Sequence, residues 1–274
     1  MLKCRGATSQ RANTLAEEDR RQYGELVEPS QDDRTQRLSM RGVPYRLTVE
    51  PVVLTHSSLE LLRPDDAIKL PGKLYAAGDP SLLKGTKRVS IIGSRDASED
   101  GKKRAAKLAR QLAEAGVIVV SGLAKGIDYA AHSGALAGGG RTIAVIGTPL
   151  DKAYPREHGP LQERIAREHL LISQFAAGSR VFPSNFVARN RVMALLSHAS
   201  VIVEAGDTSG SLSQAAETQR SERSLFFMRS VLERTDLKWP SKFQTAGAIV
   251  LDDVEQILEK LACTPSRSSP SRST

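Results

Sequence analysis

Short apolar runs alternate with longer amphipathic segments from residue 89 onward. The runs predict strands at Val89–Ile92, Val117–Ser121, Thr142–Ile146, Leu170–Ser173, Val201–Glu204, Leu225–Met228 and Ala248–Leu251. The segments between and after them predict helices at Glu99–Ala115, Ile127–Ala137, Pro160–His169, Phe186–Ser197, Leu212–Arg220 and Val254–Leu261. Continuous apolar strands separated by helices are typical of a parallel sheet that is covered on both faces. The pattern therefore predicts an α/β fold with a doubly wound, mostly parallel sheet.

The remainder of the chain divides into three parts. Residues 1–45 are polar with few apolar positions, so we expect a poorly ordered N-terminal extension with one short helix around residues 15–27. Residues 46–88 are expected to form a small extension leading into the sheet, with Leu74–Ala77 as a short edge strand after the Pro71-Gly72 turn. The main domain is expected at 89–262, followed by a disordered Ser/Arg tail at 263–274.

Composition narrows the class of protein. The chain has 274 residues, of which 40% are hydrophobic, and this is enough for one large α/β domain. No apolar run is long enough to span a membrane, and the N-terminus lacks the apolar core of a signal peptide, so we expect a cytoplasmic protein. Without a Cys/His cluster we expect no metal site. The net charge of +8 favours a polyanionic partner, although it also fits a merely solubilising surface.

The loops after the predicted strands share one chemistry. Gly93, Ser94 and Arg95 follow the first strand, where a helix N-terminus and a guanidinium suit an anion, although such a tripeptide also occurs in ordinary turns. Gly122 and Lys125 follow the second strand in a glycine-rich turn. Further loops carry Arg156 and the Gly/Ser/Thr-rich stretch 204–211. Because the carboxyl ends of parallel strands meet at one edge, these loops predict a site for a phosphate-rich ligand.

Aromatic and basic residues near that edge extend the prediction. Arg189, Asn190 and Arg191 begin a predicted helix, and we expect one of the two arginines to face the site while the other pairs with a carboxylate. Four aromatic side chains are candidates for stacking on bases, with core packing as the alternative for each of them: Tyr154, Phe175, Phe182 and Phe186.

For two other patterns we favour a role in the fold over a role in chemistry. His132 follows Asp128 by four positions, as a base and its orienting carboxylate would, but we favour a helix-capping aspartate beside a buried histidine. The basic run Lys102-Lys103-Arg104, together with Lys107 and Arg110, is interpreted as a solvated helix face.

Several of these loops together resemble one family. The resemblance runs from about Pro71 to about Phe227. It is carried by Leu74–Asp79, Ile91–Arg95, Ser121–Asp128 with Ala131-His132, Arg141–Thr148, Tyr154-Pro155, Arg189–Arg191 and Ser209–Ser211. In this order, the motifs resemble the DNA-processing protein A (DprA/Smf) family. Many members carry a C-terminal winged-helix domain. Here a Ser/Arg-rich stretch stands at that point, so we expect a divergent short member without it.

The resemblance implies an extended Rossmann-like domain that binds single-stranded DNA, with no catalytic reaction and no cofactor. It also implies a homodimer that helps load a RecA-type recombinase during natural transformation or recombination, or a variant serving a mobile element or phage defence. The DNA and phosphate contacts would fall on Gly93, Ser94, Arg95, Gly122, Lys125, Arg156, Arg189, Asn190 and Arg191.

Two alternatives stay open. The stretch Glu204-Ala-Gly-Asp-Thr-Ser-Gly-Ser211 is similar to the turn of nucleoside-monophosphate phosphoribohydrolases but lacks their Pro-Gly-Gly signature. In such an enzyme, or in a nucleotide-binding sensor of that fold, Glu204 or Glu217 would be the reactive carboxylate. The other alternative is a regulatory partner whose site has lost its ligand, and the presence of Arg95 and Lys125 argues against it.

Overall fold

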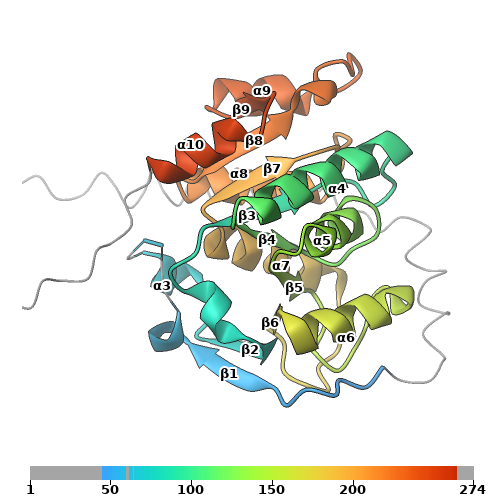
Figure 1. Cartoon of the computed structure of the whole chain (residues 1–274), viewed down its shortest axis with the longest axis vertical. Coiled ribbons are helices and arrows are strands. Elements are labelled where there is room, and N and C mark those ends of the chain that lie inside the picture. The colour runs from blue at the N-terminus through green and yellow to red at the C-terminus, as the bar shows by residue number, and fades with distance from the viewer. Residues whose placement is uncertain (1–44, 60–61, 64, 264–274) are drawn as a thin grey trace, which may run out of the picture. The chain divides into compact units, whose positions relative to one another are not determined.

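The fold is described by a computed structural model that covers residues 45–59, 62–63 and 65–263 (Figure 1). The expectations for residues 1–44, including the short helix around residues 15–27, and for the tail from residue 264 lie outside the described residues.

Within the described residues, nine strands form one sheet. The strands are β1 (Val52–Thr55), β2 (Lys73–Gly78), β3 (Arg88–Ile92), β4 (Ile118–Ser121), β5 (Thr142–Ile146), β6 (Leu170–Ser173), β7 (Ala199–Ile202), β8 (Ser224–Met228) and β9 (Ile249–Leu251). Their spatial order is β1-β2-β6-β5-β4-β3-β7-β8-β9, which Figure 1 shows running from blue β1 at the bottom to orange β9 at the top. The seven neighbouring strands β6, β5, β4, β3, β7, β8 and β9 are parallel to one another. The strand β2 pairs antiparallel with β6, and β1 pairs antiparallel with β2. The predicted doubly wound, mostly parallel sheet is therefore confirmed.

Two details of the predicted sheet were wrong. Leu74–Ala77 lies in β2, which is not an edge strand, because β1 pairs on its outer side with Leu54 opposite Leu74. The strand β7 spans Ala199–Ile202 and so lies two residues earlier at both ends than the predicted Val201–Glu204. Ser200 fits within this strand because its hydroxyl is buried and lies 2.9 Å from the Thr218 hydroxyl.

Helices cover both faces of the sheet. They are α3 (Asp66–Lys69), α4 (Glu99–Glu114), α5 (Ile127–Ala137), α6 (Gly159–Glu168), α7 (Pro183–Leu196), α8 (Ser211–Arg220), α9 (Trp239–Thr245) and α10 (Glu255–Ala262). Short 3₁₀ turns are η1 (His56–Ser58), η2 (Pro80–Leu83), η3 (Arg156–His158) and η4 (Arg229–Val231). Among the described residues, no helix is both long and apolar enough to cross a membrane.

Alternation along the strands divides the core into two layers. In β3, Val89 and Ile91 pack in the layer that α4, α5 and α10 complete, whereas Ile92 points to the layer completed by α7, α8 and α9. On the α4 side, Ala144 and Ile146 of β5 pack with α6. Because side chains of successive strand residues point to opposite faces, each apolar strand supplies both layers at once.

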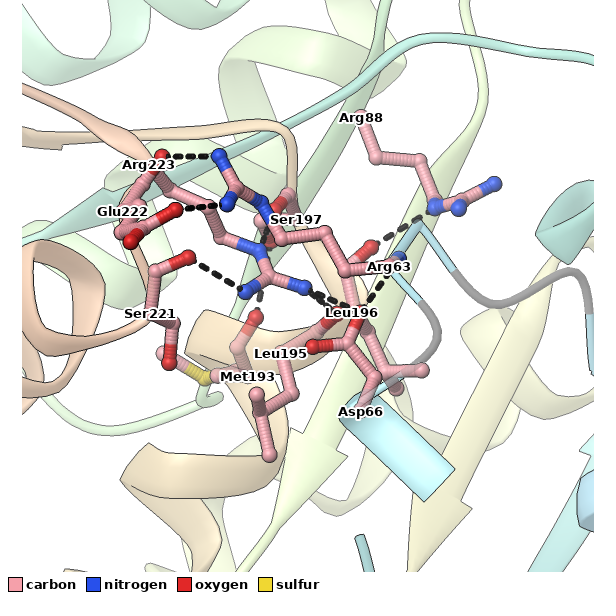
Figure 2. Close-up of polar contacts among 10 residues, drawn as sticks. All are labelled: Arg63, Asp66, Arg88, Met193, Leu195, Leu196, Ser197, Ser221, Glu222 and Arg223. Carbon is pink, nitrogen blue, oxygen red and sulfur yellow. Dashed lines mark hydrogen bonds and ion pairs between the residues drawn. The ribbon is translucent and has the colours of Figure 1, made fainter. Parts of the chain in front are cut away.

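Polar contacts connect α3 with the residue before β8, and Arg88 and Arg223 both contact the end of α7 (Figure 2). The guanidinium of Arg223 donates to the Asp66 carboxylate at 2.6 Å and to the carbonyls of Leu195 and Ser197 at 2.9 and 2.8 Å. Arg88 donates to the carbonyl of Leu196 at 2.7 Å. Two arginines thus satisfy the last carbonyls of α7, where the helix dipole favours positive charge.

Candidate nucleic-acid interface

The site lies where the direction of the chain across the sheet reverses. From β3 the chain moves to β4 on one side, and β7 leads to β8 on the other, so β3 and β7 are the neighbours at the switch point. In open α/β sheets, ligands bind outside the carboxyl ends of the strands at such a point. The loop after β3 contacts the loop after β7 directly, since the backbone N–H of Ser94 donates to the carbonyl of Glu204 at 2.7 Å.

Gly93 permits this close approach. A Cβ at Gly93 would lie 2.5 Å from the side chain of Ile127 and 2.7 Å from the Glu204 carbonyl oxygen, so any larger residue would separate the loops. Gly93 therefore contributes by having no side chain.

The turns after β3 and β4 are locked side by side. The N–H of Ile127 donates to the carbonyl of Ser94 at 3.2 Å. Gly126 has a φ of 73°, and a Cβ there would lie 2.4 Å from the Ser94 carbonyl oxygen and 2.5 Å from that of Arg95. Both backbone conformation and space therefore require glycine at this position. The result is one continuous surface of the two turns, which carries Ser94, Arg95 and Lys125.

Arg95 lies exposed at the centre of this surface. Its guanidinium carbon lies 5.4 Å from the ring centroid of Phe186, and the Phe186 ring lies 5.2 Å from that of Tyr154. Gly147, after β5, makes room for the Phe186 ring, since a Cβ there would lie 2.6 Å from it. The cation–π contact orients the guanidinium while leaving its edge available for an anion. Loops that the sequence placed at one edge therefore meet as predicted.

Lys125 and Arg156 lie on the next part of this surface. The ammonium of Lys125 lies 2.9 Å from the Glu157 carboxylate, and this hydrogen bond holds the pKa of Glu157 below its ordinary value. Arg156 is exposed at the first position of η3. The third residue of η3, His158, lies with Nδ1 2.8 Å from the carbonyl oxygen of Leu123. These contacts fix η3 against the Gly122–Gly126 turn, so the two cations lie on adjacent elements.

Arg189 lies beneath the surface rather than on it. Its side chain is only 5% exposed, and Nη1 donates to the carbonyl of Val145 at 2.9 Å. The same atom lies 3.8 Å from the Asp128 carboxylate. The guanidinium occupies the space that a Cβ on Gly122 would need, because such a Cβ would lie only 1.3 Å from Nη1. In this structure Arg189 lies buried beneath the turn and supports it from below.

Asp128 organises the same turn from the first turn of α5. Its Oδ2 accepts the backbone N–H groups of Gly122 at 3.1 Å and Ala124 at 3.4 Å. Burial raises the pKa of the Asp128 carboxyl, and the neighbouring Arg189 offsets part of this rise. The Leu123 backbone between these N–H groups has a φ of 58° and needs such support.

Asn190 and Arg191 connect α7 with α8. The Asn190 amide donates to the carbonyl of Gly210 at 3.0 Å, and the Arg191 Nε lies 3.5 Å from the Glu217 carboxylate. The expectation that one arginine of this motif pairs with a carboxylate was too narrow, because both Arg189 and Arg191 do. The motif also lies in the second turn of α7 and not at the helix start, because Pro183 begins the helix three residues before the predicted Phe186.

Glu204 and Glu217, the candidate reactive carboxylates of the phosphoribohydrolase alternative, both contact residues that hold helices in place. Glu204 accepts the backbone N–H of Ser98 at 2.8 Å and its hydroxyl at 2.6 Å. Ser98 in turn caps α4 by accepting the N–H of Gly101 at 2.9 Å. Glu217 lies 3.5 Å from both Arg191 and Arg220. Both carboxylates therefore hold helices in place at this edge.

His132 is confirmed as a buried residue of α5. It is fully buried with Nδ1 2.7 Å from the Thr142 hydroxyl, and burial lowers its pKa to about 3. The predicted helix cap was wrong, because Gly126 is the N-cap of α5 and the Asp128 carboxylate accepts from the preceding turn rather than capping the helix or contacting His132. The pair is therefore structural and not an acid–base dyad.

The basic run on α4 is a solvated face except for Arg104, which is half-buried with its guanidinium 3.6 Å from the Glu204 carboxylate. Lys102 and Lys103 pair with Glu99 and Asp100 one turn earlier, and Arg110 pairs with Glu114 at 2.7 Å. Sequence reasoning missed Glu157, which pairs with Lys125 at this edge, and Tyr129, which lies exposed in the first turn of α5. A sequence signal for Tyr129 is its place three residues after Gly126, at the start of the predicted helix.

The fold and these loops define an extended Rossmann-like α/β domain with a cationic, glycine-rich carboxyl edge. The family model of "DNA recombination-mediator protein A" matches residues 60–262, and the chain belongs to this family. It is 42% identical over 192 residues to the DNA processing protein DprA of Streptococcus pneumoniae, covering 68% of this chain and 67% of the relative. It is 32% identical over 191 residues to DprA of Bacillus subtilis, covering 70% of this chain and 64% of the relative. The chain thus spans about two thirds of the length of these relatives.

Two solved structures share the fold. The structure of DprA from Streptococcus pneumoniae superposes with a TM-score of 0.67 at 32% identity and covers 79% of this chain and 75% of that chain. A DprA structure from Helicobacter pylori, whose description concerns its single-stranded DNA binding mode, superposes with a TM-score of 0.68 at 27% identity. It covers 80% of this chain and 98% of that chain.

Proposed function

We propose that this chain binds single-stranded DNA at the carboxyl edge of its sheet, as a non-catalytic member of the recombination-mediator family. The observation that carries the proposal is the locked pair of turns that sets the exposed Arg95 beside the N-terminus of α5 and Lys125. Backbone N–H groups and guanidinium forks at a helix N-terminus suit phosphates. The single-strand binding described for the Helicobacter pylori relative supports the choice of ligand.

In this proposal the exposed cations bind phosphates, and buried or half-buried neighbours hold those cations in place. Arg95, Lys125 and Arg156 contact phosphates, while Ser94 contributes its hydroxyl, because its backbone N–H already donates to the Glu204 carbonyl. The ring of Phe186 supports Arg95 from below. Phosphate contacts carry little sequence information, so binding is expected to depend weakly on base sequence. Arg189 and Asn190 contribute by fixing the turns and not by touching DNA.

The test is fluorescence anisotropy with labelled single- and double-stranded oligonucleotides across a salt series. We expect the wild type to prefer the single strand and Arg95→Ala to bind about tenfold more weakly. Because losing one phosphate contact releases fewer counterions, the salt slope of the variant should fall by about 0.7. Arg110→Ala is the matched control, since it removes the same charge from the solvated face of α4.

Failure of the folded wild type to bind at low salt would overturn the proposal. The carboxylates of Glu204 and Glu217 would then be tested for release of free base from nucleoside monophosphates. A released base that disappears in Glu204→Ala and Glu217→Ala would establish the phosphoribohydrolase alternative.

We further propose that the DNA-bound form is a homodimer that delivers the strand to a RecA-type recombinase, supported by membership of the recombination-mediator family. Light scattering with and without oligonucleotide measures the assembly. Displacement of a single-stranded-DNA-binding protein by recombinase, followed with and without this protein, measures delivery. A strictly monomeric protein that leaves recombinase loading unchanged would contradict both statements.

A further inference from the structure

Tyr129 is an exposed aromatic residue in the first turn of α5. Its side chain is 43% exposed, and among the described residues it and Phe182 are the most exposed aromatic side chains. Burying a tyrosine ring is favourable, so a ring left in solvent beside a predicted binding surface calls for an explanation. The contacts already described for the site do not involve this ring.

The position of the ring is fixed from below by η3. Its centroid lies 4.6 Å from the ring of His158, with the two planes tilted by 41°. His158 is buried, and its Nδ1 lies 2.8 Å from the carbonyl oxygen of Leu123 in the Gly122–Gly126 turn. A ring that is already held in place loses little conformational entropy when a ligand packs on its exposed side.

Cations flank the ring on both elements that hold it. Lys125 precedes Tyr129 by four residues and pairs with Glu157 of η3 at 2.9 Å. Arg156, next to Glu157, is exposed at the start of η3. The surface therefore presents one aromatic ring and two positive side chains on adjacent elements. Such a combination fits a strand whose phosphates and bases alternate, because a stacking ring accepts any base while cations hold the backbone.

We propose that Tyr129 is a base-stacking position for single-stranded DNA, with Lys125 and Arg156 holding the phosphates on either side of the stacked base. The strand then runs from the Arg95 turn past the Gly122–Gly126 turn to η3. This inference rests on the proposed function and extends it to a second part of the surface. A stacking position needs an unpaired base, which a duplex does not offer. The inference therefore accounts for the expected preference for single strands.

The test compares an intact oligonucleotide with one of equal length built from abasic nucleotides. Tyr129→Ala is expected to bind the intact strand about tenfold more weakly than the wild type does, and Tyr129→Phe is expected to bind it within about twofold. Both variants are expected to bind the abasic strand as the wild type does, because no base is present to stack. Thermal melting of each variant verifies folding.

Tyr129→Leu separates stacking from packing. Leucine still covers His158 but has no aromatic face, so we expect it to behave as Tyr129→Ala does. Ile68→Ala, which truncates an exposed apolar side chain on α3, is the control and should leave binding unchanged. Wild-type affinity in Tyr129→Leu, or an equal loss on the intact and abasic strands, would overturn the inference.

The two proposals fail differently. If the wild type binds single strands and Arg95→Ala loses that binding while Tyr129→Ala retains it, only the stacking position is wrong. If the wild type does not bind, or Arg95→Ala has no effect, the proposed function is wrong and the stacking position falls with it.

Discussion

The guanidinium of Arg189 lies 3.8 Å from the carboxylate of Asp128, and both side chains are buried beneath Gly122. The aspartate holds two N–H groups of the turn, and the arginine fills the space below the glycine. Arg189, which the sequence suggests as a ligand contact, therefore stabilises from below the turn that carries the exposed Lys125. The site consequently has two layers, an outer one of Arg95, Lys125 and Arg156 and an inner one of Arg189 and Asp128.

Removing the charge of Arg189 should destabilise the fold. Arg189→Met leaves the Asp128 carboxylate buried without its cation, and breaking a buried pair in this way typically costs about 3–5 kcal/mol. Urea denaturation measures the loss. The double variant Arg189→Met with Asp128→Asn should recover part of it, because the uncompensated charge is gone. A double variant as unstable as the sum of the single changes would contradict the buried coupling.

Substituting Gly122 should impair both stability and DNA binding. In Gly122→Ala the new methyl group would lie 1.3 Å from Nη1 of Arg189, so the guanidinium or the turn must move. We expect a loss of about 1–3 kcal/mol, typical of overpacking, together with weaker binding of single strands in anisotropy. Gly72→Ala is the matched control, because a Cβ there meets nothing within 4 Å, and it should be close to neutral. Equal behaviour of the two variants would show that the turn adapts freely.

The Asp66–Arg223 pair should contribute to stability without contributing to binding. Both side chains are buried at 2.6 Å separation, and the pair lies near the amino end of β8, away from the site (Figure 2). Asp66→Asn should lower the free energy of unfolding by about 3 kcal/mol, while the folded protein retains its affinity for single strands. Arg63→Ala, which removes an exposed pair with Glu222, should cost under about 1 kcal/mol. Reduced DNA affinity in folded Asp66→Asn would contradict the separation of the two ends of the sheet.

Stability should fall as the pH falls below neutrality. Burial lowers the pKa of His132 from its ordinary 6.5 to about 3, so the unfolded chain takes up a proton in this range while the folded chain does not. The stability is present above pH 6.5 and is lost toward pH 3, with His132 contributing about 2 kcal/mol of loss by pH 5. His198, whose pKa burial also lowers to about 3, acts in the same direction.

Urea denaturation between pH 7 and pH 5 measures this dependence. His132→Asn should show a shallower decline than the wild type, because it keeps a polar group opposite Thr142 but takes up no proton. Parallel declines in the two proteins would show that His132 is not the source.

The sequence by itself determined the fold class and which loops meet at one edge of the sheet. The strands at Thr142–Ile146 and Leu170–Ser173 and the helix Ile127–Ala137 were predicted with the bounds that the structure has. Continuous apolar runs and flanking glycines are local signals, and parallel strands must place their following loops at one edge. Arg95, Lys125 and Arg156 are exposed at that edge, and their contact with phosphates stays a prediction.

Only the tertiary structure decided which charged residues face outward and which strands lie at the edges. Helix α9 was missed because its stability is non-local, with Trp239 packing 5.7 Å from Phe227 and its indole N–H donating to the carbonyl of Ala205 at 3.0 Å. Arg189 is buried because Gly122, far earlier in the chain, leaves it room and Asp128 compensates its charge. An arginine side chain has the same chemistry whether it is buried, as Arg189 is, or exposed, as Arg95 is. Its burial depends on partners that folding brings together, and no local pattern encodes them.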